Sequence, residues 1–305
     1  MENFDLVILT ESRFVNPTKT NEFIENIILE DQLVSNELIK LGLTVTRKSW
    51  DDKDFDWSTS KYLLVRATWD YFDRYDEFTD WFNAAAKKTT FINSEALLKW
   101  NIDKHYLQDL NKNGVNIPRT LFIEPNTITT LANSIEKAKK ELGFITTDFV
   151  LKPCVGGGAF HTYKFNESES LKQEAIFQKL IASECMMLQE FQENIVAEGE
   201  ISMMVFNGEF THAILKIAKP GDFRVQDDYG GTVHNYEPTK EQIDFAIETV
   251  FAAPELPIYA RVDIFKDNQG NWALAELEIF EPELWFRFYP KAAQVLAKGI
   301  KERLF

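Results

Sequence analysis

The chain has 305 residues, 45% of them hydrophobic and 27% charged, a composition typical of a soluble globular protein. Its length exceeds the usual size of a single hydrophobic core and predicts two or three packed units. With 33 basic and 48 acidic residues, the formal net charge of −15 argues against nucleic-acid and anionic-membrane partners, although a local basic pocket is compatible with it.

Cysteine usage and the lack of long apolar segments favour a cytoplasmic location. Cys154 and Cys185 are too few for a disulfide framework, and we expect both to be buried small hydrophobic residues rather than reactive thiols. The first residues lack the basic start and long apolar core of a signal peptide. No segment approaches the roughly 18 consecutive apolar residues that a membrane helix requires.

The N-terminal part of the chain alternates strand and helix patterns. Strands are predicted at residues 5–10, 43–47 and 62–66, and helices at residues 23–41 and 75–86. This order predicts a three-layer α/β domain with a parallel sheet, in which ligand-binding groups collect at the C-terminal ends of the strands.

Arg66 stands at the end of a predicted strand and is open to two interpretations. Its planar guanidinium suits bidentate recognition of a carboxylate or phosphate. Alternatively, it pairs with Asp70 or Asp73 and holds the following loop together. Nearby aromatic residues are predicted to be core residues rather than a stacking platform: Trp69, Tyr71, Trp81 and Phe82.

Two connector helices are predicted after residue 93. Asn93 and Ser94 can cap a helix that runs through Trp100, and a second helix spans about residues 103–111. Lys104 lies near the start of the second helix, where a cation is poorly placed against the helix dipole. Its position is either incidental or directed at an external anion.

A glycine-rich loop interrupts the next α/β segment, whose strands are predicted at residues 120–124, 148–152, 161–165 and 186–191. The loop reads Lys152-Pro153-Cys154-Val155-Gly156-Gly157-Gly158-Ala159-Phe160. Three consecutive glycines free the backbone N–H groups for close approach to phosphate. The loop lacks the Lys-Ser/Thr of a P-loop and opens no helix, so a flexible hairpin turn is the alternative. Lys152 beside the glycines favours phosphate.

The segment from residue 200 predicts a β-rich unit. Residues 200–206 and 209–217 flank Asn207-Gly208, the strongest short hairpin signal in the chain. Lys216, Lys219 and Arg224 gather positive charge in an otherwise acidic protein. A helix over about residues 238–251 precedes a second hairpin, and a closing helix spans about residues 290–303.

The second hairpin carries an acidic face. Residues 258–265 and 272–280 are β-rich and flank the turn sequence Asp267-Asn268-Gln269-Gly270. Because side chains alternate across a strand, Arg261 and Asp263 share one face, and Glu276 and Glu278 share one face of the partner strand. The opposite faces are apolar, with Ala260, Val262 and Ile264 against Ala273, Ala275, Leu277 and Ile279. Burying the apolar faces together brings three carboxylates and a guanidinium close to one another.

Carboxylates that lie so close together repel one another. The repulsion is about 4 kcal/mol per pair at about 4 Å, for an effective dielectric of about 20. Either Arg261 or a divalent cation offsets this charge, and Mg²⁺ prefers oxygen ligands that it shares with phosphates and water. A solvated hairpin with a surface salt bridge is the alternative. The apolar back face indicates a half-buried sheet whose polar side faces a partner, which favours the metal.

In their order, these parts resemble the ATP-grasp superfamily from about residue 90 to the end of the chain. The resemblance rests on Lys104, Lys152 before the glycine loop, Leu188-Gln189-Glu190-Phe191, Gly199-Glu200, and the three carboxylates of the hairpin. It implies a Rossmann-like pre-ATP-grasp domain over residues 1–93 and a two-subdomain ATP-grasp fold. The linker and small subdomain would span residues 94–191, and the large subdomain residues 192–305.

The resemblance also implies roles in nucleotide binding. Lys104 and Lys152 would contact the phosphates of ATP, and the loop with Gly156, Gly157 and Gly158 would close over them. Glu190 and Phe191 would form the hinge that meets adenine, and Glu200 would hold the ribose hydroxyls.

Three carboxylates would bind Mg²⁺ or Mn²⁺: Asp263, Glu276 and Glu278. Arg261 would contact the transferring phosphate. Glu278 departs from D-alanine:D-alanine ligase and glutathione synthetase, which usually have Asn at the third metal position, and this leaves the number of bound ions open.

A closer resemblance, over nearly the whole chain, is to bacterial ATP-grasp proteins related to O-ureido-D-serine cyclo-ligase. It rests on Val65-Arg66-Ala67-Thr68-Trp69-Asp70-Tyr71, on Lys99-Trp100-Asn101 through Lys104-His105-Tyr106-Leu107, and on Glu276-Leu277-Glu278-Ile279-Phe280-Glu281-Pro282-Glu283-Leu284. It implies a carboxylate-amine ligase that makes an acyl phosphate. The attacking amine would belong either to the same molecule, which gives cyclisation, or to a second molecule. The catalytic residues would be Arg261, Arg224 and Lys216: Arg261 would offset charge at the transferring phosphate, whereas Arg224 and Lys216, with Arg66 as a further candidate, would orient the acid or acyl phosphate.

The expected partners are a small-molecule carboxylate and an amine, and the expected assembly is a monomer or homodimer. Two other functions stay open. A small-molecule kinase would release a stable phosphorylated product, and a nucleotide-binding regulatory protein would not turn over.

Overall fold

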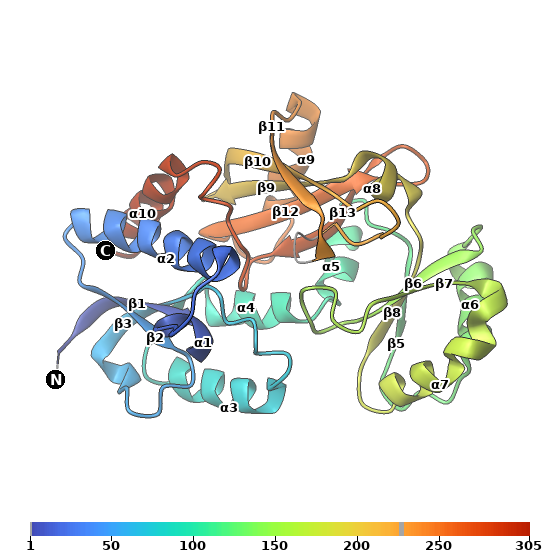
Figure 1. Cartoon of the computed structure of the whole chain (residues 1–305), viewed down its shortest axis with the longest axis horizontal. Coiled ribbons are helices and arrows are strands. Elements are labelled where there is room, and N and C mark those ends of the chain that lie inside the picture. The colour runs from blue at the N-terminus through green and yellow to red at the C-terminus, as the bar shows by residue number, and fades with distance from the viewer. Residues whose placement is uncertain (1, 226–228) are drawn as a thin grey trace.

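The computed structural model describes residues 2–225 and 229–305, and this part of the chain forms three β-sheets (Figure 1). The N-terminal sheet and the sheet of the middle segment lie at opposite ends of the view, and the sheet of the C-terminal half lies above them (Figure 1). No helix within the described ranges is both long and apolar enough to cross a bilayer.

The N-terminal sheet is parallel, with strand order β2-β1-β3-β4. Its domain contains β1 (Phe4–Thr10), α1 (Ser12–Val15), α2 (Glu22–Lys40), β2 (Val45–Ser49), η1 (Trp57–Thr59), β3 (Ser60–Val65), α3 (Tyr75–Ala86) and β4 (Thr90–Ile92). Leu6 and Ile8 of β1 pack with α2, whereas Val7 and Leu9 pack with α3. The predicted three-layer domain is confirmed, with β4 as a strand that we did not predict.

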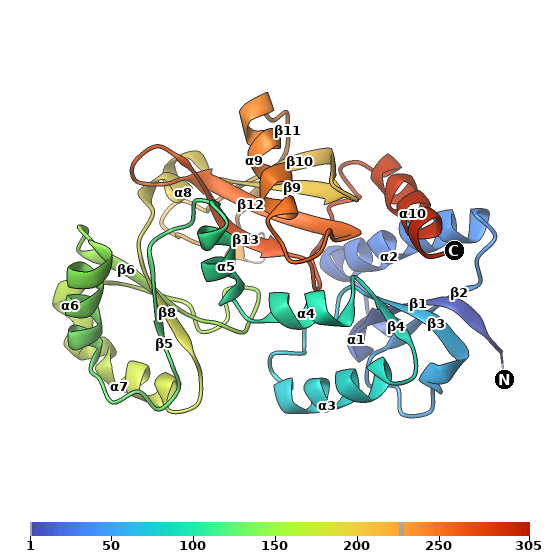
Figure 2. The same cartoon turned by 180° about the vertical axis from the view of Figure 1, so that it is seen from behind.

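The last helix, α10 (Lys291–Leu304), returns to this first domain and lies beside α2 in both views (Figures 1 and 2). Leu296 and Ile300 of α10 belong to the same buried core as Val34 and Leu38 of α2. The two ends of the chain therefore share one hydrophobic core, which fixes the C-terminal half against the N-terminal domain.

The middle sheet is antiparallel, with strand order β5-β8-β6-β7. Its elements are β5 (Thr120–Ile123), α6 (Leu131–Leu142), β6 (Asp148–Pro153), β7 (Tyr163–Asn166), η2 (Glu167–Glu169), α7 (Ser170–Ile181) and β8 (Met186–Glu190). Phe149 and Leu151 of β6 share a core with Phe177 of α7. The glycine loop joins β6 to β7.

The third sheet is also antiparallel, with strand order β11-β10-β9-β12-β13. Its elements are α8 (Glu193–Glu198), β9 (Glu200–Phe206), β10 (Glu209–Ile217), β11 (Thr232–Tyr236), α9 (Lys240–Phe251), β12 (Tyr259–Lys266) and β13 (Trp272–Glu278). The bounds of β9 and β10 are those that the Asn207-Gly208 hairpin predicted.

The register of β12 and β13 places the predicted charges on one face. Arg261 pairs with Glu278 and Asp263 with Glu276. The alternation of side chains along both strands was therefore sufficient to predict this face.

A bulge follows these pairs, and it corrects the prediction for the opposite face. Ile264 pairs with Leu274, so Ala275 is the extra residue. Leu274 joins the apolar core beside Ile264, whereas Ala273 pairs with Phe265. The expectation that Ala273 and Ala275 both lie on the apolar face is wrong, because one inserted residue inverts the alternation.

Two connector helices, α4 (Glu95–Ile102) and α5 (Tyr106–Lys112), join the N-terminal domain to the rest of the chain (Figure 2). Asn101 of α4 donates from its side-chain amide to the Leu277 carbonyl at 2.7 Å and accepts from Ile279 N at 2.8 Å. The connector is thereby fastened to the strand that carries Glu276 and Glu278.

Candidate active site

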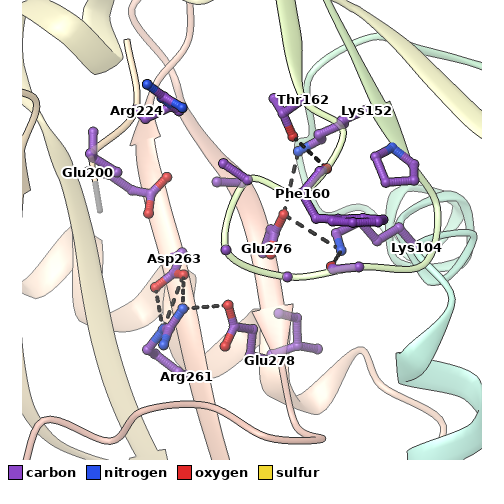
Figure 3. Close-up of a pocket in the computed structure, with 18 of the residues that line it drawn as sticks. Lys104, Lys152, Phe160, Thr162, Glu200, Arg224, Arg261, Asp263, Glu276 and Glu278 are labelled. Carbon is purple, nitrogen blue, oxygen red and sulfur yellow. Dashed lines mark hydrogen bonds and ion pairs between the residues drawn. The ribbon is translucent and has the colours of Figure 1, made fainter. Parts of the chain in front are cut away.

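A cleft of about 410 Å³ lies between the N-terminal domain and the two antiparallel sheets. Figure 3 shows the side chains that gather in it. Every residue predicted for the site lines this cleft: Lys104, Lys152, Gly156, Gly157, Gly158, Glu190, Phe191, Glu200, Lys216, Arg224, Arg261, Asp263, Glu276 and Glu278. The structure thus brings together residues that are far apart in the sequence, while their individual roles stay predictions.

Asp263 lies in a buried network of charges. Arg261 donates to its two oxygens, from Nε at 3.0 Å and from Nη2 at 2.9 Å. The Ser202 hydroxyl donates to it at 2.5 Å, and Lys216 Nζ lies 3.4 Å away. Burial opposes ionisation, but the charges of Arg261 and Lys216 and the hydrogen bonds from Arg261 and Ser202 together outweigh it and lower the pKa of Asp263 to about 2.

The same guanidinium also holds Glu278. Arg261 Nη2 donates to a Glu278 oxygen as well as to Asp263 (Figure 3). Burial raises the pKa of Glu278 to about 8, and the neighbouring carboxylates oppose the effect of Arg261. Arg261 therefore bridges two of the three carboxylates that we predicted to bind metal.

Glu276 is paired with two lysines instead. Lys152 Nζ lies 3.5 Å and Lys104 Nζ 3.9 Å from the same Glu276 oxygen (Figure 3). Burial opposes ionisation of Glu276, but the two ammonium groups lower its pKa. Two cations that share one carboxylate leave positive charge in the cleft, which suits the approach of a phosphate.

The acidic residues fit a hard divalent cation in their chemistry but are not gathered into a finished site. Carboxylate oxygens are the ligands that Mg²⁺ prefers. Across residues 2–225 and 229–305, the triad whose ligand atoms all lie within 4.8 Å of one another is His105, Cys154 and Cys185. Binding by the three carboxylates therefore requires their oxygens to move closer together, and we expect Glu278 to leave Arg261 and, given its raised pKa, to lose a proton.

The alternative of a solvated surface salt bridge is wrong. Arg261 is 9% exposed and Asp263 is 2% exposed. Charges this deep are stabilised only by their partners, so the network depends on each of its members.

The glycine loop is a hairpin connection and also one wall of the cleft. It joins the antiparallel strands β6 and β7. Lys104 Nζ donates to the Gly156 carbonyl at 2.5 Å, and the Tyr229 hydroxyl donates to the Gly158 carbonyl at 3.0 Å. Gly158 has a φ of 55°, a conformation that glycine adopts without strain. The loop is therefore held from both sides while its backbone faces the cleft.

The predicted adenine hinge lies at the end of β8. The Glu190 carboxylate accepts hydrogen bonds from Ile145 N at 2.6 Å and Thr146 N at 3.0 Å, and it is buried. That carboxylate thus fixes the small sheet locally. The Phe191 ring lines the cleft and has Lys164 Nζ 3.4 Å from its centroid, and its contact with a base stays a prediction.

Lys216 links Glu200 to the acidic network. Its Nζ lies 2.5 Å from Glu200 and 3.4 Å from Asp263. Burial raises the pKa of Glu200, and the two carboxylates raise the pKa of Lys216 against the effect of burial. Lys216 is therefore a charged member of the network, which is compatible with its predicted contact to an acid or acyl phosphate.

Arg224 enters the cleft from a separate segment. Its guanidinium is 2.7 Å from Asp222 and 3.7 Å from the centroid of the Tyr229 ring. In Figure 3 it lies beyond Glu200, on the side away from Arg261.

Neither interpretation of Arg66 is right. Its side chain is 3% exposed, is not among those that line the cleft, and donates to Glu30 on α2. Asp31 lies 4.0 Å from it. Asp70 instead accepts from Trp50 and Arg74. Arg66 therefore fixes α2 against the sheet. Its partner Glu30 is too far away in the sequence for a local pattern to predict the pairing.

Among the cleft residues that were not predicted for the site, one group belongs to the N-terminal domain or to the segment after β13. This group includes Arg13, Phe23, Trp69, Tyr71, Phe72, Glu281, Glu283 and Trp285. Tyr71 is buried, as expected of a core residue, yet it also lines the cleft. Glu281 and Glu283 stand in the motif that carries the closer resemblance, whereas no local pattern marks Arg13 or Phe23.

Comparison with known proteins accounts for most of the chain. Residues 6–93 match the N-terminal domain of D-cycloserine synthetase DcsG, and residues 103–279 match the RimK-like ATP-grasp domain. The chain belongs to the RimK-like ATP-grasp family. The predicted superfamily and fold are confirmed.

This RimK-like ATP-grasp protein is 26% identical over 280 residues to the cycloserine biosynthesis protein DcsG of Streptomyces lavendulae, across 87% of this chain and 90% of that protein. The crystal structure of D-cycloserine synthetase DcsG has a TM-score of 0.85 at 23% identity, covering 98% of this chain and 99% of that chain.

Two further solved structures share the fold. The ATP-grasp ligase PsnB, complexed with minimal precursor, Mg and ADP, has a TM-score of 0.62 at 14% identity over 99% of this chain and 100% of that chain. D-alanine–D-alanine ligase from Bacillus anthracis, complexed with ATP, has a TM-score of 0.63 at 13% identity over 98% of this chain and 96% of that chain.

Proposed function

We propose that this protein is an ATP-dependent ligase that joins a carboxylic acid to an amine, with ATP and Mg²⁺ as cofactors. One observation carries the proposal. Within a single cleft, two lysines meet Glu276 while one guanidinium meets Asp263 and Glu278. Family membership supports it, and so do the ligases of the same fold whose structures contain ADP and Mg, or ATP.

The chemistry needs positive charge more than it needs a covalent role for the protein. A carboxylate is a poor electrophile, so its oxygen first attacks the γ-phosphorus of ATP and ADP leaves. The amine nitrogen then attacks the acyl carbon of the acyl phosphate, and phosphate leaves. Both steps depend on positioning and charge neutralisation.

In the proposal, two lysines and the Arg261 guanidinium neutralise the negative charge of the phosphates. Lys104 and Lys152 would release Glu276 in part and bind phosphate oxygens, and Arg261 would contact the transferring group. Held by the three carboxylates, Mg²⁺ would add positive charge at the phosphates. Arg224 and Lys216 would orient the acid.

The substrate class is proposed to be an amino acid or a small peptide-like molecule. Aromatic side chains and charges of both signs line the part of the cleft furnished by the N-terminal domain and the C-terminal segment: Arg13, Phe23, Trp69, Glu281 and Trp285. Such a lining suits a zwitterion with an apolar portion. Intramolecular cyclisation and the joining of two molecules are both forms of this reaction. The cytoplasmic location and the oligomeric state stay predictions.

Trapping with hydroxylamine tests the proposal. The purified protein is incubated with ATP, Mg²⁺ and each member of a panel of amino acids and small peptides, and ADP and hydroxamate are measured together. A ligase should give ADP and hydroxamate in equal amounts with one acid. A persistent phosphate ester without hydroxamate would indicate a kinase, and no ADP with any acid would indicate a binding protein; either result contradicts the proposal.

A further inference from the structure

Cys154 and Cys185 face each other at the end of the β6–β8 ladder. Pro153 pairs with Met186, and at the next step Cys154 N donates to the Cys185 carbonyl at 2.9 Å. Opposed residues that share a backbone hydrogen bond have Cα atoms about 5.5 Å apart, within the span of a disulfide. The two sulfurs are 2.8 Å apart. Bond formation would therefore shorten the distance between the sulfurs from 2.8 Å to about 2.05 Å.

The two thiols differ in exposure. Cys154 is 1% exposed, whereas Cys185 is only partly buried. The expectation that both are buried hydrophobic residues is right for Cys154 and wrong for Cys185. An oxidant from solvent thus meets Cys185 first.

His105 is placed to favour the thiolate of Cys185. Its Nε2 lies 3.8 Å from Cys185 Sγ and 3.1 Å from Glu124, and its Nδ1 lies 2.7 Å from Asp103. Burial disfavours the imidazolium, but the hydrogen bond to Asp103 and the neighbouring charges raise the pKa of His105. The Cys154 S–H and the His105 charge in turn lower the pKa of Cys185, while the same contact raises the pKa of Cys154.

The geometry favours a disulfide over a metal site. Two thiolates bound to one tetrahedral Zn²⁺ at about 2.3 Å are roughly 3.8 Å apart, well beyond the 2.8 Å observed. His105 Nδ1 lies 2.7 Å from Asp103 and Nε2 lies 3.1 Å from Glu124, so a metal ion at either nitrogen would have to displace a carboxylate.

We propose that Cys154 and Cys185 form a reversible oxidation site that reacts with hydroperoxides. The Cys185 thiolate attacks the outer oxygen of the hydroperoxide, the O–O bond breaks, and an alkoxide leaves and takes a proton to become an alcohol. Cys185 is then a sulfenic acid. The Cys154 sulfur attacks the Cys185 sulfur, an S–S bond forms, and hydroxide leaves with the Cys154 proton as water. Two thiols are oxidised, and one hydroperoxide is reduced to an alcohol and water.

The site adjoins the wall of the cleft. Lys104 N donates to the Cys154 carbonyl at 2.9 Å, and Lys104 Nζ donates to the Gly156 carbonyl at 2.5 Å. The disulfide would therefore tie the base of the glycine loop to the start of β8. This inference does not rest on the ligase activity, because its test follows the thiols themselves.

The test treats the reduced full chain with a small excess of hydrogen peroxide, blocks remaining thiols with N-ethylmaleimide, and maps the peptides by mass spectrometry. The expected result is a Cys154–Cys185 disulfide, with the loss of two hydrogen atoms and full reversal by dithiothreitol. In Cys154→Ser, Cys185 should persist as a sulfenic acid that dimedone traps. His105→Asn should slow oxidation of Cys185 several-fold, and His234→Asn, at an exposed histidine, is the matched control that should not.

Three outcomes would overturn the proposal. Cys185 could be oxidised to a sulfinic acid while Cys154 stays free. Both thiols could stay reduced under the same peroxide. Stoichiometric Zn²⁺ could bind the untreated protein and block both thiols from N-ethylmaleimide, which would make the cluster a metal site instead.

Discussion

Arg261 and Asp263 lie two residues apart on β12 and face the same side, so that one guanidinium donates to both oxygens of the neighbouring carboxylate. The same guanidinium reaches across to Glu278 on β13. The carboxylates that would bind a cation are therefore already compensated without one. This lets the buried site persist in the free protein, and we expect Glu278 to be released when metal binds.

Arg261→Lys should lower kcat by about 10²-fold or more, because one ammonium group cannot reproduce the fork that donates to Asp263 and Glu278 together. Steady-state release of ADP measures the effect. Arg303→Lys is the matched control, since that guanidinium contacts Asn207 and Leu256 outside the cleft lining. If the Arg261→Lys variant had the kcat of the native protein, the proposed role of Arg261 in the reaction would be wrong.

Glu276→Gln should abolish turnover, with a loss of at least about 10²-fold, and leave the fold intact because the side chains have the same shape. The neutral amide is a weaker ligand for a hard cation and no longer holds Lys104 and Lys152 by charge. ADP release across a Mg²⁺ series, with near-ultraviolet circular dichroism as a check of the fold, measures both. The exposed Glu255→Gln is the control. Native activity at saturating Mg²⁺ would count decisively against the metal assignment.

Asn101→Ala should destabilise the protein by about 2–4 kcal/mol, because its amide serves three buried backbone groups of residues 277, 279 and 280. Asn113→Ala removes the same side chain from an exposed position with a single bond to the Ala252 carbonyl, and should cost less than about 1 kcal/mol. Urea denaturation compares the two variants. Equal losses would show that the connector is not fastened to β13 in solution.

His212 should make stability depend on pH. Burial lowers the pKa of His212 to about 4 in the folded protein, whereas the unfolded value is about 6.5. The unfolded chain therefore binds the proton first as pH falls. The stability contributed by neutral His212, up to about 3 kcal/mol, is fully present above about pH 6.5 and is lost as pH falls through about 4.

His212→Gln tests this directly, since its amide can still donate to the Leu284 carbonyl that His212 Nε2 contacts at 2.9 Å. Urea denaturation between about pH 7 and pH 4.5 should show a shallower decline in the free energy of unfolding for the variant. Parallel declines for the two proteins would mean that His212 does not titrate as described.

Local pattern predicted the acidic face well and its surroundings less well. Alternation along two strands was enough to place Arg261, Asp263, Glu276 and Glu278 together, because a strand has only two faces. The bulge at Ala275 could not be predicted, since an inserted alanine leaves the apolar pattern unchanged while it inverts the faces of Ala273 and Leu274, which precede it on β13.

Long-range contacts account for the other errors. Arg66 binds Glu30, thirty-six residues earlier, and neither residue carries a mark of that pairing. The residues around Lys104 left its role open, and only the resemblance to a known superfamily predicted that it lies near the phosphates and the glycine loop. In the structure its Nζ contacts the Gly156 carbonyl. Arg13 and Phe23 line the cleft from the N-terminal domain, which shares a hydrophobic core with α10 and the large sheet.

The central claim is that Asp263, Glu276 and Glu278 hold the divalent cation that accompanies ATP. A crystal grown with a non-hydrolysable ATP analogue and Mn²⁺, analysed by anomalous scattering, tests it most directly. We predict manganese about 2.0–2.3 Å from oxygens of these carboxylates and of the nucleotide phosphates, with Glu278 released from Arg261. Manganese and nucleotide bound elsewhere, with Glu278 still on Arg261 and Glu276 still on the two lysines, would contradict the claim.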